Sequence, residues 1–229
     1  MQNLKRVVIS AAGVGSRLGL NMPKCLVEVG GKKLIEHQLN LLSDFDEVWV
    51  VVGFKASSVI DAVLKIREDA IFVFNHRFSE TSNSESLYLA SRVMKSGFLA
   101  IDGDLLIEPN SFIEFNALIH QDEILVGYSD ATTEEAVYID IDKSDRDRMC
   151  VLSFVNSSNS DSYMPLKYEW SGVCYFPNPQ LIQRDAGYVY KQIENHPSER
   201  YAAYIKVAEI DTPNDLVLAE RKFVEWGLS

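Results

Sequence analysis

The stretch Ala11–Lys24, AAGVGSRLGLNMPK, decides how the rest of this sequence is interpreted. It directly follows an apolar run, Arg6–Ser10 (RVVIS), which is typical of a buried strand. Its small residues let a ligand approach backbone N–H groups, and Arg17 and Lys24 add two cations. A triphosphate requires both kinds of group. The loop therefore predicts a phosphate-binding turn, with a tight strand-to-helix turn bearing solvated cations as the alternative.

Two better-known phosphate loops do not fit, because each requires residues at fixed offsets. A P-loop needs GxxxxGK[ST], but Gly31-Lys32-Lys33 lacks both the earlier glycine and the hydroxyl that would hold magnesium. A dinucleotide loop needs GxGxxG, whereas the third glycine here is Gly19, one position late. The second predicted strand also ends VVVGF, without an acidic residue. A dehydrogenase is therefore a poor alternative.

The segments around this loop predict an α/β fold. Strands and helices alternate up to about residue 120, the pattern of a parallel sheet with crossover helices and ligands at the strands' carboxyl ends. Beyond it, strands joined by polar turns predict an antiparallel addition. The predicted strands are Arg6–Ser10, Glu47–Val52, Ala70–Phe74, Gly97–Ile101, Glu123–Tyr128, Ala136–Ile141, Cys150–Val155, Trp170–Phe176 and Ala203–Ile210. The predicted helices are Leu34–Leu42, Ser57–Ile66, Ser84–Met94, Pro179–Ala186, Tyr188–Asn195 and Asp211–Trp226.

The composition narrows the class of protein. A formal charge of −11 repels a polyanion, so nucleic acid is not expected as a partner. A mononucleotide remains compatible, because local cations and a bound metal can reverse the sign inside one cleft. The three cysteines show no CxxC spacing, and no stretch approaches the length of a membrane span. We expect a cytoplasmic protein that does not enter a membrane.

The sequence resembles nucleotidyltransferases with a glycosyltransferase-A-like fold, whose loop pairs small residues and G-x-G-(S or T)-R with a following P-K. It is most similar to bacterial choline-phosphate cytidylyltransferases and related enzymes for small phosphates and phosphonates. Besides the loop, the segments that carry the resemblance are PKCLVEVGGKKLIEHQL, VVVGF, FNHRFSETSNSESLYLA, IDGDLLI, WSGVCYF and EIDTPNDLVLAE. The resemblance implies a Rossmann-like three-layer sandwich around a mixed, mostly parallel sheet. It also implies a single domain over 1–229, with a nucleotide-binding half (1–120) and an acceptor-binding half (121–229).

The resemblance implies roles for individual residues of the loop and of a second block, Thr81–Leu87 (TSNSESL). Arg17, Lys24 and Asp104 become the expected catalytic residues: the two cations would stabilise the charge on a departing pyrophosphate, and Asp104 would act through a bound Mg²⁺. The second block offers hydroxyls and an amide for a base or ribose, although helix capping is the alternative. The expected nucleotide-binding residues are Ala11, Ala12, Gly13, Gly15, Ser16, Ser82, Asn83, Ser84 and Ser86.

Two aspartates are predicted to hold Mg²⁺, which prefers hard oxygen ligands. Asp104 and Asp211 each follow an apolar run, GFLAIDGD and YIKVAEID, and would reach the same end of the sheet if those strands run parallel. The resemblance implies the same pair. Asp211 could instead cap the helix that follows it. Asp102 is a candidate to support the metal ligands from outside the coordination sphere.

For the acceptor, Tyr128, Glu169 and Trp170, with Tyr168, are candidates for an aromatic and acidic cage around a cationic group; core packing is the alternative. The resemblance implies transfer from CTP to phosphocholine, aminoethylphosphonate, a phosphorylated amino-acid amide or a similar acceptor, with release of pyrophosphate. The products would serve surface polysaccharide or lipid decoration, and we expect a monomer or homodimer. The alternatives are a sugar-1-phosphate nucleotidyltransferase using UTP, GTP or dTTP, and a nucleotide-binding regulatory module without turnover.

Overall fold

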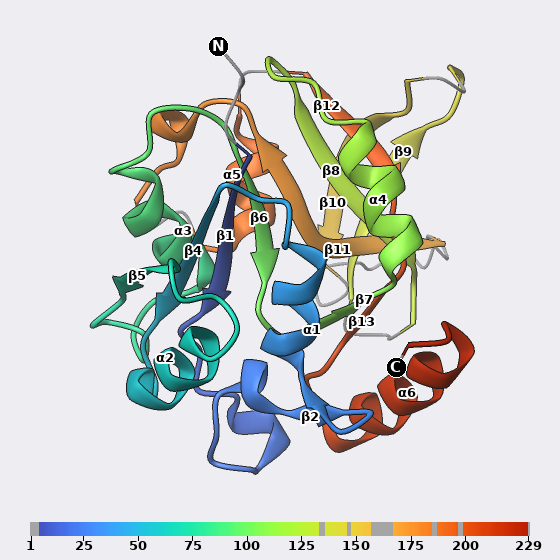
Figure 1. Ribbon diagram of the computed structural model, residues 1–229. Helices are drawn as coiled ribbons and strands as arrows, with labels where there is room; N and C mark the ends of the chain where they lie inside the picture. Colours follow the sequence, from blue (N-terminus) through green and yellow to red (C-terminus); the bar gives the residue numbers. More distant parts are fainter. Residues whose placement is uncertain are drawn as a thin grey trace.

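A nine-stranded sheet forms the centre of the computed structural model, which describes residues 5–132, 136–145, 148–156, 167–184, 187–196 and 199–228 (Figure 1). Within these residues the strand order is β5-β4-β1-β6-β11-β8-β12-β10-β9. In chain order these strands are β1 (Arg6–Ala11), β4 (Glu47–Val52), β5 (Ile71–Phe74), β6 (Phe98–Asp102), β8 (Ile124–Asp130), β9 (Val137–Asp142), β10 (Cys150–Asn156), β11 (Tyr168–Phe176) and β12 (Arg200–Tyr204).

The sheet is mixed, as predicted, but it is not mostly parallel. Strands β5, β4, β1 and β6 run parallel, which is the predicted series of strands and crossover helices. Strand β11 lies antiparallel to both β6 and β8, and β10 lies antiparallel to β12 and β9. The remaining pair, β8 and β12, is parallel. Parallel pairing therefore predominates only in the half of the sheet that carries the glycine loop.

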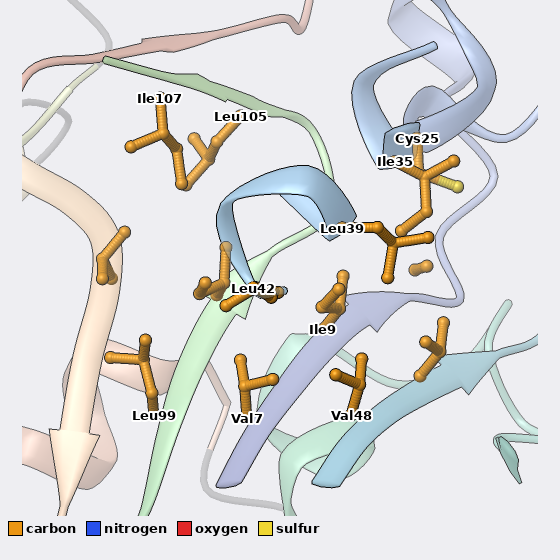
Figure 2. Close-up of a cluster of buried hydrophobic side chains, with 14 of the residues drawn as sticks. Val7, Ile9, Cys25, Ile35, Leu39, Leu42, Val48, Leu99, Leu105 and Ile107 are labelled. Carbon is orange, nitrogen blue, oxygen red and sulfur yellow. The ribbon is translucent and has the colours of Figure 1, made fainter. Parts of the chain in front are cut away.

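Helices cover both faces of this sheet. On one side lie α1 (Leu34–Leu41), α2 (Ala56–Leu64) and α4 (Pro109–Ala117), and on the other lie α3 (Asn83–Ser91) and α5 (Val189–Glu194). Alternation along a strand explains how one strand serves both layers. Val7 and Ile9 of β1 pack with α1, as Figure 2 shows, while Val8 between them packs with α3.

A third apolar cluster joins the two ends of the chain. Its strands are β2 (Glu28–Val29), β3 (Lys32–Lys33), β7 (Leu105–Ile107) and β13 (Val207–Glu209), arranged as the pairs β2–β3 and β7–β13. Helix α6 (Pro213–Glu225) packs Ala219 and Phe223 against Val29 of β2 and Ala208 of β13. The C-terminal helix is thereby held beside the segment that follows the glycine loop (Figure 1).

Several predicted elements need correction. The predicted strand Ala203–Ile210 is two strands, β12 and β13, because the chain leaves the large sheet after Tyr204 and pairs with β7 instead. Of the predicted helix Pro179–Ala186, the described residues form only a 3-10 turn at Pro179–Leu181. Helix α4 and the short strands β2, β3 and β7 had not been predicted. Within the described part of the chain, no helix is long and apolar enough to cross a membrane.

Candidate active site

A cavity of about 710 Å³ opens at the carboxyl ends of β1 and β6. The glycine loop, the start of α3 and the turn between β6 and β7 each contribute to its wall. Strand β11, the start of α5 and the segment between β13 and α6 complete it. This is the edge at which open α/β sheets bind ligands, and we call the cavity the cleft.

The glycine loop is folded so that its two cations, Arg17 and Lys24, both line the cleft. Gly15 has φ 65°, and a Cβ there would lie 2.8 Å from Lys24 Cγ and 3.3 Å from the Met22 carbonyl oxygen. Both the left-handed backbone and the close approach of Lys24 therefore require glycine. A 3-10 turn, Ser16–Leu18, follows at once and carries Arg17. The predicted residues Ala11, Ala12, Gly13, Gly15, Ser16, Arg17 and Lys24 all line the cleft.

The two cations contact the two predicted aspartates. Lys24 Nζ lies 2.7 Å from Asp104 Oδ2 and also donates a hydrogen bond to Asp211 Oδ1. Arg17 Nη2 lies 2.5 Å from Asp211 Oδ2. Burial alone would lower the pKa of Lys24, but Asp104 and Asp211 raise it above its ordinary value. The four charged residues predicted to contact the triphosphate or the metal thus belong to one cluster.

The reason that the aspartates meet differs from the prediction. Asp104 lies in the turn between β6 and β7, while Asp211 follows β13, which belongs to the small sheet. Strand β13 runs antiparallel to β7, with Glu209 opposite Leu105. The Ile210 N–H donates to the Asp104 carbonyl oxygen at 3.0 Å. An antiparallel pair, not two parallel strands of the main sheet, therefore brings these carboxylates together.

Among the described residues, three carboxylates form a group that could hold a metal ion. Oxygens of Asp104, Glu209 and Asp211 all lie within 4.8 Å of one another. Three hard oxygen donors fit Mg²⁺. The surrounding protein and the charges of Asp104 and Asp211 raise the pKa of Glu209. Glu209 was missed, although its spacing of two from Asp211 along an extended segment could have indicated it.

Asp102 lies on the inner side of this group. Burial, followed by the charge of Asp104, raises the pKa of Asp102 to about 7, while a hydrogen bond from Asn83 acts in the opposite direction. The Asn83 Nδ2 donor is 3.3 Å from Asp102 Oδ1. Asp102 also lines the cleft, and its role in supporting the metal ligands stays a prediction.

The predicted base-reading block reaches the cleft in part. Ser82, Asn83 and Ser86 line it, whereas Ser84 is fully buried, its Oγ 3.3 Å from Ser82 Oγ, and is not among the lining residues. Asn75 also lines the cleft, and its Nδ2 donates to Ser86 Oγ at 3.2 Å. Asn75 was missed, although it lies directly after β5 in the quoted segment FNHRFSETSNSESLYLA.

Aromatic residues line one part of the cleft, which we call its aromatic end. Glu169 and Trp170 line it, as predicted for an acceptor site, and burial raises the pKa of Glu169. Tyr188 and Tyr190 lie there too, with stacked rings 5.8 Å apart, and were missed because a short helix carries no acceptor signal.

Tyr128 does not belong to this aromatic end of the cleft. It is 4% exposed, packs in the core below α3 and α5, and lies edge-on to Tyr168 and Tyr204. Lys143 places its ammonium 4.0 Å from the Tyr168 ring centroid. The predicted cage residues Tyr128 and Tyr168 therefore surround a cation of the protein itself.

Comparison with known proteins shows the family of the chain. A family model described as MobA-like NTP transferase domain matches residues 7–141. The choline-phosphate cytidylyltransferase of Streptococcus pneumoniae is 32% identical over 112 residues, covering 47% of this chain and 48% of that protein. The CMP-5'-(3-aminopropyl)phosphonate synthase of Streptomyces rubellomurinus is 34% identical over 115 residues, covering 45% of this chain and 18% of that protein. The matches thus span about half or less of these relatives.

Solved structures resemble the chain over nearly its whole length. The inositol-1-phosphate CTP transferase of T. maritima superposes with a TM-score of 0.76 at 18% identity, covering 96% of each chain. The CTP:phosphocholine cytidylyltransferase of Streptococcus pneumoniae gives 0.73 at 21% identity, covering 96% of this chain and all of that one. At these identities the likeness establishes the fold.

Proposed function

Because the chain belongs to the MobA-like NTP transferase domain family, we propose that it transfers a cytidylyl group from CTP to a small phosphate or phosphonate. The observation that carries the proposal is the cluster of Arg17, Lys24, Asp104 and Asp211 at the glycine loop. Two cations and two carboxylates there suit a triphosphate and its metal. We propose that residues 1–229 act as one catalytic domain.

In the proposed reaction an oxygen of the acceptor's phosphate or phosphonate attacks the α-phosphorus of CTP. The bond from that phosphorus to the bridging oxygen breaks, and pyrophosphate leaves. Backbone N–H groups after β1 would bind the phosphates, and Arg17 and Lys24 would stabilise the negative charge on the departing pyrophosphate. The acceptor oxygen is already anionic, so the protein mainly positions it and needs no covalent intermediate.

We assign Mg²⁺ to the three carboxylates Asp104, Glu209 and Asp211, whose oxygens lie within 4.8 Å of one another. A bound Mg²⁺ would neutralise phosphate charge during transfer. Lys24 and Arg17 now pair with two of these carboxylates. Those cations would be released toward the phosphates when the metal and nucleotide enter, because a divalent ion competes for the same oxygens.

The acceptor would lie at the aromatic end of the cleft, beside Glu169, Trp170 and the Tyr188–Tyr190 pair. A carboxylate among aromatic rings suits a cationic head group. The support for CTP and for this acceptor class is the cytidylyltransferase and phosphonate synthase relatives. We propose that the product serves surface polysaccharide or lipid decoration. We also propose that the protein itself lies in the cytoplasm.

A matrix of substrates tests this proposal. Pyrophosphate release would be measured with CTP, UTP, GTP and ATP, each combined with phosphocholine, 2-aminoethylphosphonate and sugar 1-phosphates, with and without Mg²⁺. We expect release with CTP and a small phosphate or phosphonate, in the presence of Mg²⁺. Release only from UTP or GTP with sugar phosphates would favour the sugar-nucleotide alternative. Nucleotide binding without release in any combination would favour a regulatory module.

A further inference from the structure

The amide of Asn83 joins two parts of the cleft that are far apart in the sequence. Its Nδ2 lies 3.3 and 3.4 Å from the two carboxylate oxygens of Asp102, at the end of β6. Its Oδ1 accepts a hydrogen bond of 3.2 Å from the N–H of Val189, the first residue of α5. Asn83 itself is the first residue of α3. One side chain thus connects three elements.

The orientation of this amide follows from the chemistry of its partners. A backbone N–H can only donate and a carboxylate can only accept, so the oxygen must point to Val189 and the nitrogen to Asp102. The N–H of a first helical residue has no acceptor within its own helix. Tyr188, at the N-cap of α5, supplies no side-chain cap. Asn83 therefore satisfies a donor that α5 leaves open.

The start of α5 is also the aromatic wall of the cleft, which we define as Tyr188, Val189 and Tyr190. Tyr188 is 58% exposed, whereas Val189 and Tyr190 are buried. A helix of six residues has little stability of its own. Its placement therefore depends on contacts with other elements, which include this hydrogen bond from Val189 to Asn83 of α3.

We propose that Asn83 is a positioning residue. It holds the aromatic wall at a fixed position relative to Asp102 and thereby increases the affinity for the acceptor. This inference rests on the proposed function and changes one part of it. Asn83 had been expected to read the nucleotide, but both ends of its amide are engaged by protein groups. Its loss therefore affects the acceptor more than the nucleotide.

The variant Val189→Pro removes the N–H donor and keeps a small apolar side chain, and proline is favoured at the first helical position. The preceding residue, Tyr188, has φ −91° and ψ 158°, which proline tolerates in its neighbour. Asn83→Ala removes the acceptor of the same hydrogen bond. The double variant completes a thermodynamic cycle. Asn178→Ala is the matched control, because Asn178 caps a separate 3-10 turn and is exposed.

The first measurement is hydrogen exchange of the α5 amides in the ligand-free protein, which requires no substrate. Asn83→Ala should speed exchange at Lys191 and Gln192 about 5-fold, the effect of one lost hydrogen bond. Val189→Pro should act in the same direction, and the double variant should be no faster than Asn83→Ala. Asn178→Ala should leave these rates unchanged. Unchanged α5 exchange in Asn83→Ala would overturn the proposal.

The second measurement is the KM for phosphocholine and for CTP in the same variants. Asn83→Ala and Val189→Pro should each raise the phosphocholine KM about 5-fold and change the CTP KM less than about 2-fold. The double variant should match Asn83→Ala. Two results would contradict the positioning role. One is a double variant whose phosphocholine KM rises by the product of the two single effects, and the other is an equal rise in the KM values for phosphocholine and CTP. If the wild-type protein releases no pyrophosphate, the proposed function fails, while hydrogen exchange still decides whether Asn83 positions the wall.

Discussion

The ammonium of Lys24 lies between two carboxylates, those of Asp104 and Asp211, which come from segments more than a hundred residues apart. Its side chain is 19% exposed, and theirs are 17% exposed. In a partly buried cluster of this kind, each charge is compensated by the opposite charges around it. Removing one side chain leaves part of the remaining charge uncompensated. We therefore expect that Mg²⁺ can replace the Lys24 ammonium beside these carboxylates.

Asp104→Asn tests the proposed role of this carboxylate. We expect turnover to fall at least about 100-fold, because a metal ligand matters more than the groups that support it. Circular dichroism should show an intact fold, because Asp211 still pairs with Lys24. Asp69→Asn is the matched control, since Asp69 forms an exposed pair with Arg67 far from the cleft and should retain activity. An active Asp104→Asn variant contradicts the assignment.

Lys24→Met tests the exchange of cations. Without nucleotide, removal of the ammonium should make Mg²⁺ bind several-fold more tightly, because a competing positive charge is lost from Asp104 and Asp211. With nucleotide, turnover should fall at least about 100-fold. Titration calorimetry with Mg²⁺ alone measures the first effect. Equal or weaker Mg²⁺ binding by the variant would show that Lys24 does not occupy the metal's place.

The cysteines give a prediction that does not depend on function. Burial raises the pKa of Cys25 to about 12 and also raises that of Cys174. Since the thiolate is the reactive form, Cys25 should react very slowly at pH 8. Cys150 is only partly buried. A thiol-reactive dye at pH 8 should label Cys150 first, and all three cysteines after denaturation. Rapid labelling of Cys25 in the native protein would contradict this.

At this scale the sequence predicted the charged cluster better than the acceptor site. Arg17 and Lys24 lie in one loop motif, so their role could be inferred from spacing. Glu209 contributes through its place in β13, and the small sheet that holds β13 has no signal in the sequence. Tyr128 shows the opposite error, since an aromatic residue on a strand looks the same in a core and in a cage.

Among the elements, helix α6 connects the site to the end of the chain. Thr212 and Asp215 form a capping box: the Asp215 N–H donates to Thr212 Oγ1 at 3.3 Å, and the Thr212 N–H donates to Asp215 Oδ2 at 2.8 Å. The Asp211 N–H donates to the same carboxylate at 3.2 Å. The helix cap therefore also fixes the backbone of a proposed metal ligand.

Thr212→Ala should lower the free energy of unfolding by about 1 kcal/mol, the usual effect of losing a side-chain cap. Thr212→Ser keeps the hydroxyl and should stay within a few tenths of the unchanged protein. Urea unfolding followed by circular dichroism measures both. If the serine variant loses as much stability as the alanine variant, the hydroxyl is not the stabilising group.

This helix was predicted from its cap, because Thr212 and Pro213 are strong start signals. Strand β13 was not separated from β12, since both lie in one apolar run and only the pairing with β7 divides them. Local signals therefore predicted where elements begin. They could not predict which sheet an element joins, because pairing depends on residues far away in the chain.

At the scale of the whole molecule, the parallel half of the sheet carries the glycine loop, and β11 and α5 add the aromatic wall. The alternation of strands and helices predicted the first half and its ligand-binding edge. The position of β11 between β6 and β8 was not predictable. Strands β7 to β10 lie between β6 and β11 in the chain, so the pairing of β11 with β6 depends on distant residues. The cleft thus lies where the two halves share one sheet.

Phosphorus NMR of CTP, Mg²⁺ and phosphocholine or 2-aminoethylphosphonate with the protein follows the proposed cytidylyl transfer itself. We expect one pyrophosphate for each CTP consumed, together with a product in which the α-phosphorus is joined to the acceptor. We expect neither signal with Asp104→Asn. Release of orthophosphate would mean attack at the γ-phosphorus. That result, or consumption of UTP or GTP with sugar 1-phosphates but not of CTP, would contradict cytidylyl transfer.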